Sequence, residues 1–233
     1  MINQKFVGVL GGMGPDATVT MFQNILRATP AHSDQEHLRL LVYNNPKIPD
    51  RTAAICAGGP DPLPALIESA RLLERAGVDL IVIPCVTAHY FYDGIQAAIT
   101  VPVLHIVQET LKFASSQHPD SKKLGLLSTM GTMQTGLFPR FADEWGATVI
   151  VPPEEMIQNL VMRAIYRIKA GEFTGEPSAL LQQAATHLIQ AGAQAIIAGC
   201  TEIPLALRPD DVSVPFLDPM KILAQAVVAQ AMG

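Results

Sequence analysis

The sequence predicts an α/β fold made of two similar halves, each built around its own parallel sheet. Two observations predict this class. Short, continuously apolar runs alternate with longer stretches in which apolar residues recur at helical spacing. In addition, two motifs recur in the same order in the second half of the chain, which indicates a duplicated structural unit. Buried strands that alternate with helices are typical of parallel sheets with right-handed crossovers.

The N-terminal part of the chain contains four strand-like runs. Most residues of each run are apolar, as expected for a strand buried on both faces. The second helical stretch ends at Gly77, a residue type that often terminates helices. The predicted strands are residues 6–10, 38–43, 80–83 and 103–106, and the predicted helices are residues 17–27 and 63–76.

The same alternation resumes in the C-terminal part. Gly171 and Gly192 follow two helical stretches and are expected to end them. The predicted strands are residues 124–127, 148–151 and 195–198, and the predicted helices are residues 155–170, 178–191 and 220–232. We expect the last helix to pack back on the first half.

An internal repeat relates the two halves. The glycine-rich segment that starts at Gly8 aligns with the segment that starts at Gly125, and the strand that ends at Cys85 aligns with the one that ends at Cys200. Each cysteine lies eight residues after a glycine and is followed by a threonine within two residues. We therefore predict two α/β domains related by a pseudo-twofold axis, with the active site between them. The first comprises residues 1–102 and 215–233, and the second comprises residues 103–214.

Composition narrows the function classes. Apolar residues make up 49% of the 233 residues and charged residues 16%, with a formal net charge of −5. The chain is too apolar to be disordered, and the absence of any block of like charge argues against nucleic acid or a membrane surface as partner. The apolar runs are too short to span a membrane, and the N-terminal residues do not resemble a signal peptide. We expect a cytoplasmic protein that acts on a small polar molecule.

The cysteines and histidines do not indicate a structural framework. Three cysteines without a C-x-x-C pair predict neither a disulfide scaffold nor a zinc site. The six histidines show no metal-ligand spacing. We therefore expect no metal, and no motif indicates a cofactor.

Cys85 and Cys200 are the strongest candidates for chemistry. In parallel α/β sheets, ligands bind beyond the carboxyl ends of the strands, where both cysteines are expected. A helix N-terminus behind each would stabilise a thiolate. Two thiols on opposite sides of a substrate suit the removal of a proton from one face of a carbon and its return to the other. The alternative is that both are small buried apolar residues, the interpretation that we keep for the unmatched Cys56.

The glycine turn over residues 12–17 matches a relaxed G-x-G-x-x-A pattern, so a dinucleotide site has to be considered. Two features oppose it. The second strand ends in Asn44-Asn45-Pro46, without an acidic residue for a ribose, and the repeated copy over residues 128–132 lacks the glycines. A turn with free backbone N–H groups at a helix start can also bind a carboxylate, and a purely structural turn is equally compatible.

Three further side chains have both a functional and an ordinary interpretation. Arg51, in a polar loop after a strand, offers bidentate geometry to a carboxylate, but most loop arginines are simply solvated. Lys169, near the end of a helix, complements the helix dipole. His89 lies four residues after Cys85 and could tune that thiol, although a buried core histidine is the better interpretation.

Five segments spread over nearly the whole chain form a recognisable set. They are Gly-Gly-Met-Gly-Pro at 11–15, Asn-Asn-Pro-Lys-Ile-Pro-Asp-Arg-Thr at 44–52, Pro-Cys-Val-Thr-Ala-His at 84–89, Ala-Gly-Cys-Thr-Glu-Ile-Pro at 198–204 and Asp-Pro-Met at 218–220. Together they resemble the cofactor-independent aspartate/glutamate racemase family, and within it the aspartate racemase branch.

The resemblance implies roles for individual residues. Cys85 and Cys200 correspond to the paired acid/base residues, and Arg51 and Lys169 to the ligands of the substrate carboxylates. The resemblance also implies a homodimer that acts on an acidic amino acid without a cofactor. The remaining positions implied to line the substrate pocket are Met13, Val86, Thr87, Thr132 and Thr201.

Two positions bear on which acidic amino acid is expected as the substrate. Glutamate racemases carry a histidine after the second Cys-Thr, whereas this chain has Glu202, which favours aspartate. The family usually has asparagine after the first cysteine, whereas Val86 can offer a substrate only its backbone N–H.

The leading hypothesis is a racemase that interconverts L- and D-aspartate independently of pyridoxal phosphate. The alternatives are a cysteine-dependent isomerase or decarboxylase on the same fold, with a maleate-type substrate, and a small-carboxylate binding protein that has lost catalysis.

Overall fold

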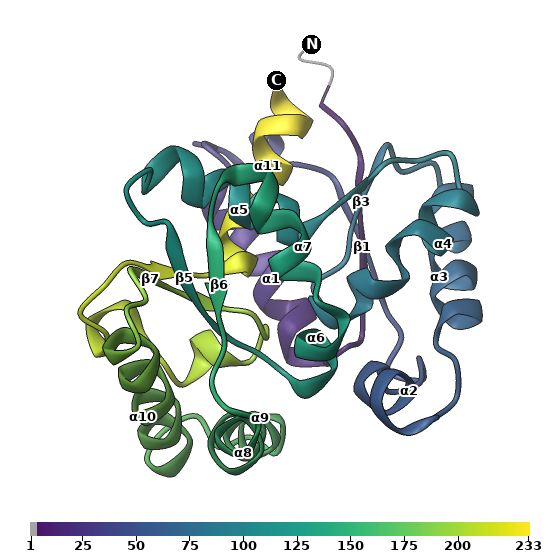
Figure 1. Ribbon diagram of the computed structural model, residues 1–233. Helices are drawn as coiled ribbons and strands as arrows, with labels where there is room; N and C mark the ends of the chain where they lie inside the picture. Colours follow the sequence, from purple (N-terminus) through teal and green to yellow (C-terminus); the bar gives the residue numbers. More distant parts are fainter. Residues whose placement is uncertain (1–3) are drawn as a thin grey trace.

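The computed structural model describes residues 4–233 and contains two parallel four-stranded sheets flanked by helices (Figure 1). Both sheets have the same strand order, in which the second strand along the chain lies at one edge beside the first, and the third and fourth follow on the other side. The predicted α/β class with two similar parallel-sheet halves is confirmed.

The first sheet has the order β2-β1-β3-β4, with the central pair aligned so that Val7 lies opposite Leu80. Its side chains alternate between two faces, as the pleat requires. Val7 and Val9 point into a core shared with the second sheet, whereas Leu10 and Ile81 join a separate cluster with the helices of the outer face. The strands are β1 (Val7–Gly11), β2 (Leu40–Asn44), β3 (Leu80–Val82) and β4 (Val103–Leu104).

The second sheet has the order β6-β5-β7-β8 and the same alternation. Leu124 and Leu126 point into the shared core, whereas Leu127 and Ile196 pack with helices on the outer face. The two sheets therefore face one another across a common apolar layer. The strands are β5 (Lys123–Leu127), β6 (Thr148–Ile150), β7 (Ala195–Ala198) and β8 (Phe216–Leu217).

Helices fill the crossovers, and several were not predicted. Between residues 155 and 170, where one helix was expected, the chain passes from α8 through a π-helical segment, η4 (Ile157–Met162), into α9. The α-helices are α1 (Pro15–Ala28), α2 (Arg51–Ala57), α3 (Leu63–Arg75), α4 (Tyr92–Ala97), α5 (Ile106–Gln117), α6 (Met130–Thr135), α7 (Leu137–Ala142), α8 (Glu154–Met156), α9 (Arg163–Lys169), α10 (Glu176–Gln190) and α11 (Pro219–Met232). Short 3₁₀ segments are η1 (Asp34–Glu36), η2 (Thr87–Phe91), η3 (Asp143–Trp145), η5 (Ile203–Leu205) and η6 (Pro209–Asp211).

Sheet membership differs from the predicted division of the chain. Strand β4, just after the expected boundary at residue 102, pairs with β3 in the first sheet. Strand β8, just after the expected boundary at residue 214, pairs with β7 in the second sheet. Each half thus completes its own sheet before the chain crosses over, and the predicted boundaries cut one strand from each sheet.

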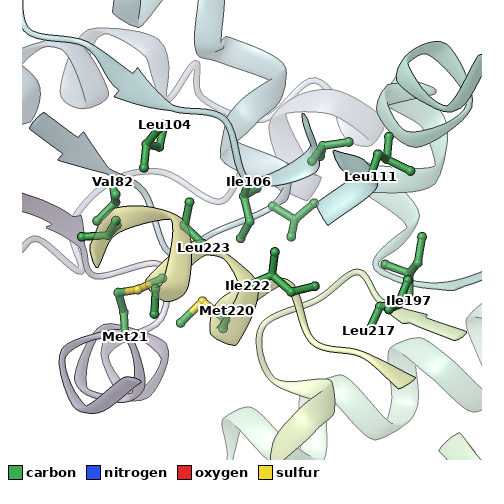
Figure 2. Close-up of a cluster of buried hydrophobic side chains, with 14 of the residues drawn as sticks. Met21, Val82, Leu104, Ile106, Leu111, Ile197, Leu217, Met220, Ile222 and Leu223 are labelled. Atoms are coloured by element: carbon green, nitrogen blue, oxygen red, sulfur yellow. The ribbon is translucent and has the colours of Figure 1, made fainter. Parts of the chain in front are cut away.

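Helix α11 contributes to the layer between the sheets (Figure 2). It packs on α1, as expected, and also on α5. Its side chains Met220, Ile222 and Leu223 lie between Val82 of the first sheet and Ile197 of the second, and Leu223 is completely buried. Burial of this helix ties the two halves into one core. Within residues 4–233, no helix is both long enough and apolar enough to cross a bilayer.

Candidate active site

Two cavities share five lining residues beyond the strand ends: Met13, Asp50, Arg51, Lys169 and Glu202. The larger cavity has a volume of about 370 Å³, and the smaller one, of about 30 Å³, is lined by both candidate cysteines. Residues from both halves line each cavity. The site therefore lies between the halves, as the repeat predicted.

Cys85 and Cys200 occupy equivalent places after β3 and β7. Cys85 lies three residues beyond β3, where its N–H donates to the Ile83 carbonyl at 2.8 Å. Cys200 lies two residues beyond β7, and its carbonyl accepts from the N–H of Ile203 at 3.0 Å. The elements that follow, η2 and η5, are short 3₁₀ segments, so the expected helix N-termini behind the thiols are absent. The exposed fractions of the two residues are nearly equal, 6% and 7%.

The two sulfurs differ in their neighbours. The Cys200 thiol donates to Glu202 Oε2 at 2.9 Å. Burial, followed by the Glu202 charge, raises the pKa of the Cys200 thiol well above its ordinary value, and Lys169 opposes this shift. No side chain among residues 4–233 makes a comparable hydrogen bond to Cys85 Sγ, although the sulfur lines the same small cavity.

Lys169 lies at the end of α9 and lines both cavities. Its Nζ is 3.4 Å from Glu202 Oε1. Burial opposes the ammonium charge, but Glu202 and the two cysteines outweigh it, so the pKa of Lys169 lies above its ordinary value. Lys169 is therefore a charged group within electrostatic reach of both sulfurs. This position at the cavity favours a functional role over a role in which the side chain only complements the helix dipole.

Arg51 is buried at the first position of α2 rather than solvated in a loop. Asp50 begins this helix, since its side chain accepts from the Ala53 N–H at 2.7 Å. Arg51 Nη1 donates to the carbonyls of Ile48 and Pro49 at 3.2 and 3.0 Å, whereas its Nε is buried and unpartnered within the described chain. Nη2 lies 3.5 Å from the Met13 carbonyl, so the guanidinium is fixed at the wall of both cavities.

Threonines bridge the two halves behind the cysteines. Thr87 Oγ1 lies 3.1 Å from Thr129 Oγ1 and 2.8 Å from Thr132 Oγ1. Thr87, Thr129 and Thr201 line the small cavity, but Thr132 does not. Thr132 is 1% exposed, and its hydroxyl contacts that of Thr87 behind the cavity wall.

The glycine turn brings Met13 to both cavities, as predicted. Gly12 has φ +100°, and a Cβ there would lie 2.3 Å from the backbone carbon of Asn45, so only glycine fits. Its N–H donates to Thr18 Oγ1 at 2.8 Å. The Gly12 N–H is therefore occupied, whereas the N–H groups of Met13 and Gly14, which line the larger cavity, donate to no other group among residues 4–233.

Val86 lines the small cavity while its side chain joins the shared core, with 2% exposure. His89 is a core residue, as expected. It lies 2.9 Å from the Cys85 carbonyl through Nδ1, and its Nε2 accepts from the Ile106 N–H at 3.2 Å. Cys56, by contrast, is exposed, so its interpretation as a buried apolar residue is wrong.

Sequence reasoning missed four lining residues of the small cavity, although three of them lie in segments that carried the resemblance. Asp50, Thr52 and Glu202 belong to those segments, but none was assigned to the pocket. Thr129 occupies the repeat position of the glycine turn. The four residues are Asp50, Thr52, Thr129 and Glu202. Among residues 4–233, no three His, Cys, Asp or Glu side chains gather closely enough to hold a metal ion.

Two halves of one topology, each with a strand-end cysteine at a common cavity, define a class of α/β protein with a pseudosymmetric site. Comparison with known proteins identifies the family. The profile of the Asp/Glu/hydantoin racemase family matches residues 10–227, and the chain belongs to that family.

Individual relatives agree with this assignment. The broad specificity amino-acid racemase RacX of Bacillus subtilis is 31% identical over 229 residues, which cover 96% of each chain. The structure of the Picrophilus torridus aspartate racemase has a TM-score of 0.83 at 27% identity and covers 97% of this chain and 94% of its own. A putative Asp/Glu racemase from Yersinia pestis has a TM-score of 0.82 at 28% identity, with 98% and 100% coverage.

Proposed function

We propose that the protein is a cofactor-independent racemase that interconverts L- and D-aspartate by proton transfer between two cysteines. The observation that carries the proposal is the pair of strand-end cysteines, one from each half, at a single small cavity. A carbon held between two such groups can lose a proton from one face and gain one on the other. Membership of a racemase family supports the reaction class.

In the proposed reaction, one cysteine enters as thiolate and the other as thiol. The thiolate removes the α-proton, and the electron pair left on the α-carbon spreads into the α-carboxylate. The opposite thiol then gives its proton to the other face of that carbon. Backbone donors support this step, because among residues 4–233 the N–H groups of Val86 and Thr201 donate to no other protein group. Such donors stabilise developing negative charge on oxygen.

Two cations support an acidic substrate. Arg51 and Lys169 both line the two cavities, and Lys169 lies within electrostatic reach of both sulfurs. Arginine binds carboxylates with bidentate geometry, and lysine acts as a point charge. Aspartate has one carboxylate for each cation. The named relatives include both an aspartate racemase and a broad specificity racemase, so the substrate range is itself part of the test.

Single-cysteine variants test the proposal. We expect Cys85→Ala and Cys200→Ala each to lower the rate of L-aspartate racemisation by about 10²–10⁴-fold, because each removes one acid/base group. Circular dichroism of the substrate solution measures the rate. The control is Cys56→Ala, since Cys56 is exposed and outside both cavities and its loss should leave the rate unchanged. Wild-type rates in either single variant would reject the two-cysteine reaction.

The same assay separates the alternatives. Incubation with maleate or an arylmalonate tests the isomerase and decarboxylase hypotheses, for which aspartate turnover should be absent. Binding of aspartate without any change in optical activity would instead indicate a binding protein.

A further inference from the structure

Glu202 is the side chain that makes the two halves of the site unequal. Its carboxylate is 4% exposed and follows Cys200 by two residues. Oε2 accepts from the Cys200 thiol at 2.9 Å and from Thr201 Oγ1 at 3.2 Å, and Oε1 pairs with Lys169 Nζ at 3.4 Å. Two hydrogen-bond donors and one cation thus converge on one carboxylate.

An ionised Glu202 carboxylate at this distance would favour the protonated thiol of Cys200 over its thiolate. A thiol can donate to it, whereas a thiolate would place a second negative charge 2.9 Å away in a buried site. No carboxylate among the described residues makes such a contact with Cys85 Sγ. Solvent exposure does not distinguish the two cysteines, because the exposed fractions of Cys200 and Cys85 are 7% and 6%.

We propose that Glu202 is a positioning residue that keeps the proton on Cys200 in the free protein, so that Cys85 is the resting base. This role rests on the proposed racemase function. In the first turnover, the substrate α-proton forms a bond to Cys85 sulfur. The carbanion electron pair then takes the proton of Cys200, whose S–H electrons remain on sulfur as the thiolate.

The protein is then left with a Cys85 thiol and a Cys200 thiolate that faces Glu202. Lys169 offsets this charge, because its ammonium lies beside Glu202 and within electrostatic reach of both sulfurs. The resting state returns when Cys200 takes a proton from water and Cys85 releases one, or when the opposite enantiomer reacts in reverse. The charged and titratable side chains that line the small cavity together with the two sulfurs are Asp50, Arg51, Lys169 and Glu202.

Alkylation by iodoacetamide tests the inference without any substrate. The reagent forms an S–C bond with a thiolate and releases iodide, so the pH dependence of labelling reports the ionisation of each sulfur. Peptide mass spectrometry follows the three cysteines separately in the intact protein, with exposed Cys56 as the internal reference. We expect Cys85 to reach half-maximal labelling at lower pH than Cys200.

The matched variants are Glu202→Gln and Glu202→Asp. Glutamine keeps the size of the side chain without the charge, and we expect it to lower the labelling midpoint of Cys200 by at least about one pH unit while that of Cys85 changes less. Aspartate restores the charge and should recover most of the shift. Lys169→Met should move the Cys200 midpoint upward, because it removes the opposing charge.

Two results would overturn the inference. One is labelling of Cys200 before Cys85 in the wild-type protein, which needs no variant to fold. The other is an unchanged Cys200 midpoint in a folded Glu202→Gln protein. Failure of the proposed function gives a different result: no racemisation of aspartate, with the labelling order and its dependence on Glu202 intact.

Discussion

At the scale of single residues, the site contains two cysteines at equivalent positions after β3 and β7, but the side chains around the two sulfurs differ. The repeat made the cysteine pair visible in the sequence because both lie at the same position after a buried strand. The ion pair between Glu202 and Lys169 and the burial of Arg51 could not be predicted, because they depend on how segments distant in sequence meet. Arg51, for example, donates to two carbonyls from its own segment but meets Lys169 only across the cavity.

Substrate selectivity follows from the two cations. Alanine has one carboxylate, so one of the two cations gains no substrate partner: Arg51 would then face only backbone carbonyls, or Lys169 would keep only its ion pair with Glu202. An uncompensated buried charge costs about 3 kcal/mol or more, which corresponds to roughly a hundredfold. We therefore expect kcat/KM for L-aspartate to exceed that for L-alanine by at least about this factor, measured by circular dichroism. Equal values would contradict the assignment of Arg51 and Lys169 as carboxylate ligands.

At the scale of elements, the helices that escaped prediction lacked either a common N-cap residue or enough residues to show a helical period. Helix α5 starts after His105, whose Nδ1 accepts from the Gln108 N–H at 3.4 Å, and histidine is not a common N-cap. Helix α2 does have an acidic cap in Asp50, but its seven residues are too few to show a helical period. The long amphipathic helices α3 and α10, both ended near a glycine, were predicted within a few residues.

The start of α5 predicts a pH dependence of stability. Burial, and secondarily the charge of His89, lowers the pKa of His105 to about 3, whereas an unfolded histidine titrates near 6.5. The unfolded chain therefore binds more protons, and the contribution of His105, complete above about pH 6.5, is lost as the pH falls toward 3. The pKa of buried His89 is also lowered by desolvation and acts in the same direction.

Urea unfolding at pH 7.5 and pH 5 measures this effect. We expect the free energy of unfolding to fall by about 2 kcal/mol through His105 alone. The control is His105→Asn, which keeps a cap acceptor but cannot titrate and should show a smaller pH dependence. The same pH dependence in that variant would show that other groups are responsible.

At the scale of the whole molecule, the repeat predicted two similar sheets but not how they join. Strands β4 and β8 have two residues each, too short for any pattern to assign them to a sheet. The apolar layer between the sheets could not be predicted either. Helix α11 is apolar almost all round, so its periodicity does not indicate which half it packs against. Only the folded arrangement shows that one core contains side chains of both sheets (Figure 2).

A shared core predicts that the halves unfold together. Leu223→Ala removes a completely buried side chain from this layer and should cost about 2–5 kcal/mol. Far-ultraviolet circular dichroism and the fluorescence of Trp145, in the second half, should still report one coincident transition. The control on the same helix is Gln225→Ala, which is exposed and should change stability by less than about 0.5 kcal/mol. Two separated transitions would contradict the single core.

The isotope content of both enantiomers at low conversion tests the two-cysteine reaction most directly. The reaction starts from L-aspartate in D₂O, where both thiols exchange with solvent. With one base on each face, newly formed D-aspartate should carry deuterium at the α-carbon. Recovered L-aspartate should retain ordinary hydrogen at that carbon, provided that the product leaves the site faster than it reverts. Equal deuterium in recovered L-aspartate and new D-aspartate would show that a single group both removes and returns the proton, and would contradict the assignment of Cys85 and Cys200 to opposite faces.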